Sequence, residues 1–392
     1  MEDDSTYTGF DEDENDSSED NDSSPPARYP KFRIVYQTTN YHLPQIDDLL
    51  SKGDIVNIRP EYQRRLRWDS KKKSALIESF LLNIPIPPVF FYESDFAQYE
   101  VMDGQQRLNC IREFYQNSFK LTGLKQLPEL NGSRRTDLDE KIRRTLDRAS
   151  IAAIVLLAES AENKDQSKTI RKEVFERLNT GGQKLNAQEI RNAIYAGNFN
   201  DMIIELTREP LFTEIWGIPP YTENTKGDYY DNPRRQKNVL YRTMGDCQIV
   251  LRFFALQDPE QIKGSMQKVL NNTAETGMSF AKEKCAELKN HYMKCLDAAV
   301  KIGGKEPFDV VSPTGTAKRS IPFQDALMCG LGRLNEAERS QLLANTKVAK
   351  KDLSDFTGNP ANYDILVGRA NTAEDTKDRI AKVHNILKSS IQ

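Results

Sequence analysis

The chain has 392 residues, of which 38% are hydrophobic and 29% charged, with a mean hydropathy of -0.67. This length suggests two domains, or one domain with a long extension. No apolar run approaches the roughly 18 residues of a membrane span, so we expect no membrane partner. The five cysteines form no CxxC pair, and the N-terminus has neither a basic start nor an apolar core. These features argue against a disulfide framework, a zinc site and a signal peptide, and favour a cytoplasmic protein.

Charge is distributed unevenly along the chain. Residues 1–27 hold 11 Asp or Glu and no Lys or Arg, so we expect a disordered acidic tail. The remainder then carries 55 Lys and Arg against 58 - 11 = 47 Asp and Glu, a net charge of +8. This balance suits a polyanionic partner such as nucleic acid, although it also fits a solvated surface. The tail is either a solubilising extension or an intramolecular mimic of nucleic acid.

Strand and helix patterns alternate from residue 31 to residue 102. Residues 31–38 predict a strand, and residues 43–56 a short helix ended by Gly53. After Trp68, Asp69 or Ser70 can cap a helix that the prolines of "IPIPP" stop. Residues 89–93 and 98–102 then predict two strands of a hairpin. The apolar face expected for the helix consists of Leu76, Ile77, Phe80, Leu81 and Ile84.

The stretch "YEVMDGQQRLNCI", residues 99–111, lies at the expected junction between a strand and a helix. Asp103 and Gln106 have the spacing of a capping box, which by itself would explain both residues. Gly104 permits close approach of another backbone or a ligand. The helix start offers free N–H groups at the positive end of the helix dipole, and Arg107 lies one turn further on. The stretch therefore predicts either a structural cap or a site for an anion.

A second polar stretch, "FERLNTGGQKLNAQEI", covers residues 175–190. A helix is expected to end at residues 178–179, and Asn186 with Glu189 forms another capping box. The turn between them, which contains Asn179, Gly181 and Gly182, is either a connector or a nest of N–H groups that binds a phosphate beside Arg107.

The rest of the chain is predicted to be mostly helical after a buried strand at residues 150–160. Residues 234–257 read as one long helix, with Arg242 and Asp246 as an i,i+4 pair. The chain has only three histidines, far apart in sequence, so we expect no HNH nuclease site. Between residues 120 and 148, four arginines either contact a nucleic-acid backbone or lie on a solvated helix face: Arg134, Arg135, Arg143 and Arg144.

Four motifs occur in one order: "RPEYQRRLRW", "IPIPPVFFYE", "VMDGQQRLNCI" and "VFERLNTGGQKLNAQEIRNAIYAG". In order and spacing they resemble the N-terminal domain of GmrSD-type restriction endonucleases, which belongs to the ParB/sulfiredoxin superfamily. The resemblance implies an α+β fold, with a small nucleotide-binding core followed by a mostly helical C-terminal domain. We therefore expect a tail at 1–27, a nucleotide-binding domain at 28–200 and a helical domain at 201–392.

The family signature falls on consecutive residues of this chain. It implies that phosphate chemistry is performed by Asp103, Gln105, Gln106 and Arg107, with Gly104 in contact with the nucleotide. Asp103 would also hold a metal, for which Mg²⁺ is expected. A cysteine nucleophile of sulfiredoxin is replaced by Gln105, which excludes sulfinic acid repair. Other residues that the resemblance assigns to nucleotide binding are Tyr62, Gln63, Arg64, Asn179, Gly181 and Gly182, with Trp68 as a further family position.

The resemblance implies a nucleoside triphosphatase in a DNA-directed system that acts against phage. Because an HNH site is not expected, DNA cleavage would require a separate nuclease subunit or an unrecognised site. Two alternatives stay open: a ParB-like DNA-binding or adaptor protein that uses the nucleotide as a switch, and a nuclease that acts through the core itself. An oligomer is compatible with each of them.

Overall fold

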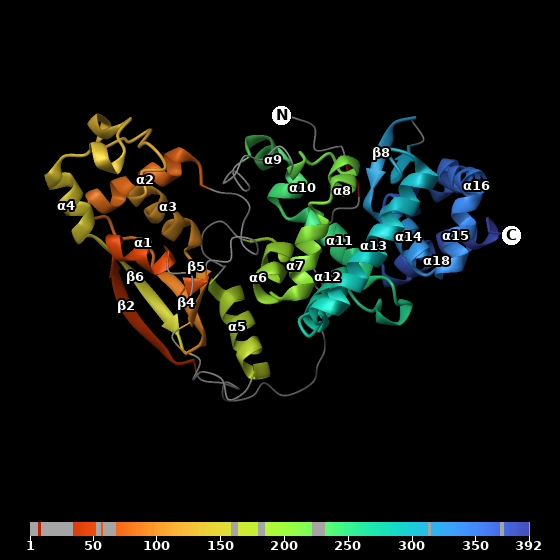
Figure 1. Ribbon diagram of the computed structural model, residues 1–392, viewed down its shortest axis with the longest axis horizontal. Helices are drawn as coiled ribbons and strands as arrows, with labels where there is room; N and C mark the ends of the chain where they lie inside the picture. Colours follow the sequence, from red (N-terminus) through yellow and green to blue (C-terminus); the bar gives the residue numbers. More distant parts are fainter. Residues whose placement is uncertain are drawn as a thin grey trace. The chain divides into compact units, whose positions relative to one another are not determined.

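The computed structural model describes residues 7–8, 34–51, 56–57, 68–96, 98–157, 164–178, 185–221, 232–312, 315–368 and 372–391. Two compact units are present: one is Asp22–Leu185, and the other is Asn186–Gln392 with Met1–Asn21. The expected acidic tail therefore lies outside the described residues except for residues 7–8. Together the two units give the α+β fold that was predicted (Figure 1).

A five-stranded mixed sheet forms the centre of the first unit, in the order β2-β6-β4-β5-β3. The predicted hairpin is confirmed as the antiparallel pair β4 and β5, and β6 lies parallel to β4 and antiparallel to β2. The strand that was expected at residues 31–38 is β2, which begins at Tyr36. Residues 34–35 are not part of it, and residues 31–33 lie outside the described part. The strands are β2 (Tyr36–His42), β3 (Val56–Asn57), β4 (Val89–Asp95), β5 (Gln98–Asp103) and β6 (Ser150–Leu156).

Helices of the first unit pack on this sheet and on one another (Figure 1). They are α1 (Leu43–Ser51), α2 (Ser70–Leu81), α3 (Gln105–Tyr115), α4 (Glu140–Arg148) and α5 (Lys164–Leu178). Helix α2 begins where predicted, since Asp69 Oδ1 accepts a hydrogen bond from Lys72 N at 2.8 Å. Its apolar face is shorter than expected: the helix ends at Leu81, Asn83 has a φ of 54°, and Ile84 is 51% exposed.

Helix α3 places the DGQQR motif because its apolar residues recur at helical spacing. Leu108, Ile111 and Phe114 are fully buried in the core that also contains Ile77 and Phe91. Each buried side chain of this size contributes about 1.5–3 kcal/mol from removal of apolar surface from water. This packing fixes α3 against the sheet, and the polar residues that precede Leu108 occupy its first turn.

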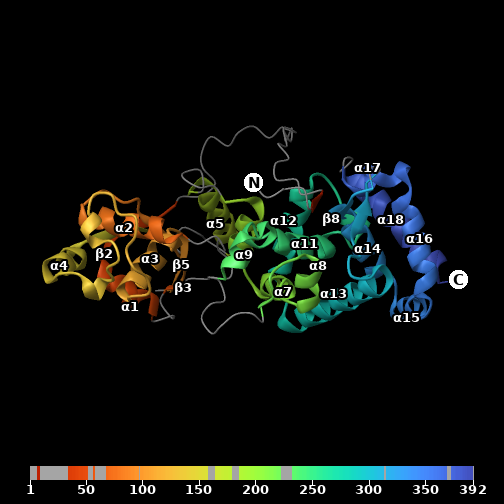
Figure 2. The ribbon, with the colours of Figure 1, turned by 90° about the horizontal axis from the view of Figure 1, so that it is seen from above.

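The second unit is helical, with one small sheet in the order β1-β8-β7 (Figure 2). Helix α14 packs against α11, α13 and α18, and eleven of its residues are buried. The strands are β1 (Tyr7–Thr8), β7 (Asp309–Val311) and β8 (Ala317–Ser320). The helices are α6 (Ala187–Ile194), α7 (Asn198–Leu206), α8 (Pro210–Ile215), α9 (Pro233–Lys237), α10 (Val239–Arg242), α11 (Gly245–Ala255), α12 (Met266–Gly277), α13 (Lys282–Gly303), α14 (Ile321–Gly332), α15 (Glu336–Ala344), α16 (Thr346–Gly358), α17 (Tyr363–Leu366) and α18 (Ala373–Ser389).

The division between the units falls after Leu185, ahead of the boundary expected at residue 200. The reason is α6, which packs against α11 and α12. Arg191 Nε donates to Asn271 Oδ1 at 2.7 Å, and Asn186 Nδ2 donates to the carbonyl oxygen of Thr243 at 2.8 Å. The capping box of Asn186 and Glu189 is confirmed, and it marks the start of the second unit.

The single helix expected at residues 234–257 is wrong. The chain forms α9, α10 and α11 instead, because Asn238 caps α10 and Met244 adopts a left-handed conformation with a φ of 57°. Arg242 and Asp246 therefore lie on different helices, and the spacing of four residues does not place them one turn apart. Among the residues that the structure describes, no helix is both long and apolar enough to cross a membrane.

Candidate functional site at the start of helix α3

The DGQQR motif spans the junction between β5 and α3. Strand β5 ends at Asp103, Gly104 adopts a left-handed conformation with a φ of 96°, and α3 begins at Gln105. The first helical hydrogen bond runs from Leu108 N to the carbonyl oxygen of Gly104 at 3.0 Å. The N–H groups of the three preceding residues, 105–107, thus belong to the first turn, where helical carbonyl acceptors are lacking. The junction has the N–H donors and the positive dipole end that an anion requires.

Gly104 is required by its packing as well as by its backbone conformation. A Cβ atom at this position would lie 2.4 Å from Val89 Cγ1 and 2.9 Å from Val89 Cβ. Real Cβ atoms essentially never come that close to another heavy atom. The group that approaches Gly104 closely is the side chain of Val89 in the neighbouring strand β4, whereas the sequence suggested another backbone or a ligand.

The predicted capping box of Asp103 and Gln106 is wrong. The residue that caps α3 is Gly104, and no side chain caps the helix. Asp103 Oδ2 instead accepts a hydrogen bond from Arg107 Nη2 at 2.8 Å, and Gln106 Oε1 accepts one from Trp68 N at 3.2 Å. The helix cap is Gly104, one residue later than expected. The side chains of Asp103 and Gln106 therefore bond to Arg107 and Trp68 instead of to the backbone N–H groups of a capping box.

Arg107 is held in place at the base of the first turn. Its Nη2 donates to Asp103 and also to the carbonyl oxygen of Pro88 at 3.1 Å. The Arg107 side chain is 15% exposed, whereas that of Asp103 is 52% exposed. The Nε of Arg107 is buried and has no hydrogen-bond partner within the described part of the chain. The guanidinium is preorganised by its two bonds, but its Nε is enclosed and is not a donor that a ligand can reach.

The other motif residues divide into those that the structure describes and those that it does not. Gln105 is described and buried, with 6% of its surface exposed, so it lies on the core side of the helix start. Trp68 meets Gln106 through the bond given above, which links the end of the "RPEYQRRLRW" motif to α3. Outside the described residues lie Tyr62, Gln63, Arg64, Asn179, Gly181 and Gly182, and their roles stay predictions.

One ion pair that the sequence did not reveal connects β5 to α5. Arg171 Nη2 lies 2.8 Å from Glu100 Oε2, and the two side chains are 19% and 11% exposed. Glu100 stands in the middle of the apolar strand "YEVM", and a charged residue at a buried strand position is itself a signal that a partner exists. Helix α5 is followed by the Asn179 segment, and β5 is followed by the DGQQR motif. The ion pair therefore joins the two elements that precede these motifs.

The only metal ligand expected from the sequence is Asp103. Its carboxylate is about half exposed and remains accessible while one oxygen is bonded to Arg107. Across the described ranges, no group of three or more His, Cys, Asp and Glu residues is arranged to hold a metal ion. Mg²⁺ commonly uses one or two carboxylates together with phosphate oxygens and water, so a single aspartate beside a phosphate site fits this ion better than a structural metal.

Taken together, the first unit is a small α+β domain with a candidate anion site at a strand-to-helix junction. Residues 46–196 match the family model described as GmrSD restriction endonuclease, N-terminal domain. This match confirms, for that segment, the resemblance seen in the four motifs. No curated protein and no solved structure matches the chain. The match includes the sheet from β3 onward and ends just after α6.

Proposed function

We propose that this protein binds a nucleoside triphosphate at the start of α3 and hydrolyses it as part of a restriction-like, DNA-directed system. The observation that carries the proposal is the state of Arg107. Its guanidinium is fixed by Asp103 and Pro88 at the positive end of a helix. A phosphate oxygen at this helix start would accept hydrogen bonds from the first-turn N–H groups, and the guanidinium would share its negative charge.

The residues of the motif have separate roles in this proposal. Arg107 and the N–H groups of the first turn hold the phosphoryl oxygens and stabilise charge that develops on them. Gln105 or Gln106 orients the attacking water, and Asp103 either polarises that water or holds the metal. Magnesium, when bound, neutralises phosphate charge and favours departure of the leaving group. Arg64 and the Asn179 segment would complete the phosphate site.

The Asp103–Arg107 ion pair also favours a second candidate function. A carboxylate that is engaged by an arginine is less available to a metal or to water than a free one. The site would then bind nucleotide without turnover, and the nucleotide would act as a switch in a DNA-binding adaptor. Binding and hydrolysis must therefore be measured on the same variants.

The test uses the full chain, each of the four ribonucleoside triphosphates and Mg²⁺, with release of inorganic phosphate as the measured quantity. Arg107→Ala and Asp103→Asn are expected to reduce turnover by about 10²–10³-fold, the usual cost of one lost charge-stabilising group. Arg112→Ala is the matched control, because Arg112 lies on the same helix, beyond its first turn, and within the described ranges its side chain bonds only to Asn109 of that helix. Turnover should stay unchanged in that variant.

The outcomes separate the candidate functions. If hydrolysis in the Arg107 and Asp103 variants equals that of the natural protein, the proposed site is wrong. The second candidate function, a nucleotide switch, is correct if three results are found together: the natural protein binds a nucleotide, Arg107→Ala abolishes that binding, and the natural protein releases no phosphate. Incubation of plasmid with the same mixtures tests the core as a nuclease, since nicking that is lost with Arg107→Ala would assign DNA cleavage to this site.

A further inference from the structure

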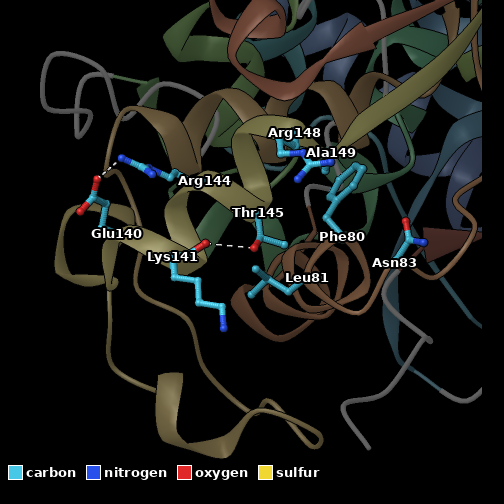
Figure 3. Close-up of a pocket in the computed structure, with 9 residues that line it drawn as sticks. All are labelled: Phe80, Leu81, Asn83, Glu140, Lys141, Arg144, Thr145, Arg148 and Ala149. Atoms are coloured by element: carbon cyan, nitrogen blue, oxygen red, sulfur yellow. Dashed lines mark hydrogen bonds and ion pairs between the residues drawn. The ribbon is translucent and has the colours of Figure 1, made fainter.

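A groove of about 590 Å³ lies between the C-terminal end of α2 and helix α4, away from the DGQQR junction. Phe80 and Leu81 of α2 form its apolar side, and α4 supplies the polar side (Figure 3). Its lining residues are Phe80, Leu81, Asn83, Glu140, Lys141, Arg144, Thr145, Arg148 and Ala149. The groove therefore combines an apolar wall with a wall that has more positive than negative charge.

Contacts on the opposite face of α4 determine which residues line the groove. Leu146 is fully buried in the core. Asp147 Oδ1 accepts hydrogen bonds from Tyr115 Oη at 2.9 Å and from Arg135 Nη2 at 2.8 Å. Because α4 is fixed on that side, the face with Lys141, Arg144 and Arg148 is turned to the groove, and all three residues are exposed.

These three cations recur at i, i+3 and i+7, so they form one stripe along the helix. The stability of the protein explains the stripe only in part, through Arg148, which lies in the last turn of α4 where the helix dipole favours a positive charge. Lys141 and Arg148 form no ion pair within the described part of the chain, and Arg144 pairs only with the exposed Glu140. Lys141 also lies in the first turn of α4, where a positive charge opposes the helix dipole. A stripe of cations that mostly lack anionic partners beside a groove is suited to an external polyanion.

We propose that this groove binds the phosphodiester backbone of a nucleic acid. From residue 141 to residue 148 the helix rises about 10.5 Å, at about 1.5 Å per residue. Successive phosphates of one DNA strand are about 3.4 Å apart along the duplex axis, so a stripe parallel to that axis spans about three phosphate intervals. The inference extends the proposed function, because it gives a DNA-directed protein a surface for DNA, but it does not depend on nucleotide hydrolysis.

The structure also selects among the arginines that the sequence offered for this role. Arg135 is bonded to Asp147 and lies with its guanidinium 4.4 Å from the Tyr115 ring centroid, so it acts as an internal support for α4. Arg143 is half-buried and is not among the groove residues. Arg144 is the one member of the original set that lines the groove, where Lys141 and Arg148 join it.

The experiment measures the affinity of the full chain for a fluorescein-labelled DNA duplex, and for the matching single strand, between 50 and 200 mM NaCl. The test variant is Lys141→Gln/Arg144→Gln/Arg148→Gln. The control variant is Lys347→Gln/Lys350→Gln/Lys351→Gln, which removes the same charge from exposed positions of α16. Circular dichroism establishes that both variants are folded.

Three lost phosphate contacts should reduce the slope of log affinity against log salt by about 2.7 for a duplex and about 2.1 for a single strand. Between 50 and 200 mM NaCl, that slope corresponds to about 40-fold and about 20-fold in affinity. The groove holds the form of DNA whose slope falls by the amount expected for that form. The control variant should keep the natural slope.

Three results would overturn the inference: a natural protein that does not bind DNA, a control variant that loses as much slope as the test variant, or polyglutamate of equal charge that competes as well as DNA. The last result would assign the groove to an acidic protein. Phosphate release by the test variant should equal that of the natural protein. If the test variant loses DNA binding and the natural protein shows no nucleotide turnover, the proposed hydrolysis is rejected and the assignment of the groove to DNA is retained.

Discussion

Gly104→Ala provides a direct test of the structural account of the DGQQR junction. A non-glycine residue in a left-handed conformation costs about 1–2 kcal/mol. The added Cβ would also meet Val89 Cγ1 at 2.4 Å, and overpacking of this kind typically costs about 1–3 kcal/mol. The free energy of unfolding of the first unit should therefore fall by about 2–5 kcal/mol, a large part of the usual 5–15 kcal/mol of a domain.

Gly132→Ala is the matched control, because Gly132 lies in the same unit and also has a positive φ, of 90°, but a Cβ there would meet nothing within 4 Å. This variant should lose only the conformational part, about 1–2 kcal/mol. The chain has two tryptophans, Trp68 in the first unit and Trp216 in the second. In a Trp216→Phe background, urea denaturation followed by fluorescence reports on the first unit. Equal losses for the two alanine variants would refute the clash with Val89.

Two further predictions concern buried groups. Glu100→Gln should lower the free energy of unfolding of the first unit by about 1–3 kcal/mol, because Arg171 loses its charged partner at a site that is largely shielded from water. Urea denaturation followed by tryptophan fluorescence measures this loss. An unchanged urea midpoint would contradict the prediction. Burial raises the pKa of Cys295 from 9.0 to about 11, so at pH 8 its thiolate fraction is about 100-fold lower. Reaction of native protein with a thiol reagent should therefore be slow at Cys295 and accelerate on unfolding, and mass spectrometry that found rapid native labelling there would be inconsistent with this burial.

The sequence predicted elements well where local signals and core packing agree. The strands β4, β5 and β6 and the cap of α2 at Asp69 are examples, since apolar alternation and a capping side chain are both local properties. The long helix over residues 234–257 failed for the opposite reason. Its apolar spacing is helical throughout, and the break comes from Met244, a residue that rarely adopts positive φ and does so here while fully buried.

The candidate site was only partly predictable. The spacing of Asp103 and Gln106 correctly marked a helix start, but the same spacing could not distinguish a capping box from the observed bonds to Arg107 and Trp68. Those bonds accompany the left-handed turn at Gly104, where Val89 in another strand leaves no room for a side chain. The Glu100–Arg171 pair joins residues 71 positions apart (171 - 100 = 71), and no local pattern in a single sequence specifies such a partner.

The Asp103–Arg107 ion pair has a consequence for selectivity among anions. Because the guanidinium charge is balanced by a carboxylate, the helix start is close to electrically neutral apart from its dipole. Chloride or another monovalent ion would gain little binding free energy there, since it must compete for Arg107 with the Asp103 carboxylate, which is held next to the arginine by the chain. A triphosphate brings several charges and can use the N–H groups as well as the arginine. In the proposed nucleotide site, the Asp103 carboxylate would compete with the ligand for Arg107, and a multiply charged ligand would displace it more readily than a monovalent ion.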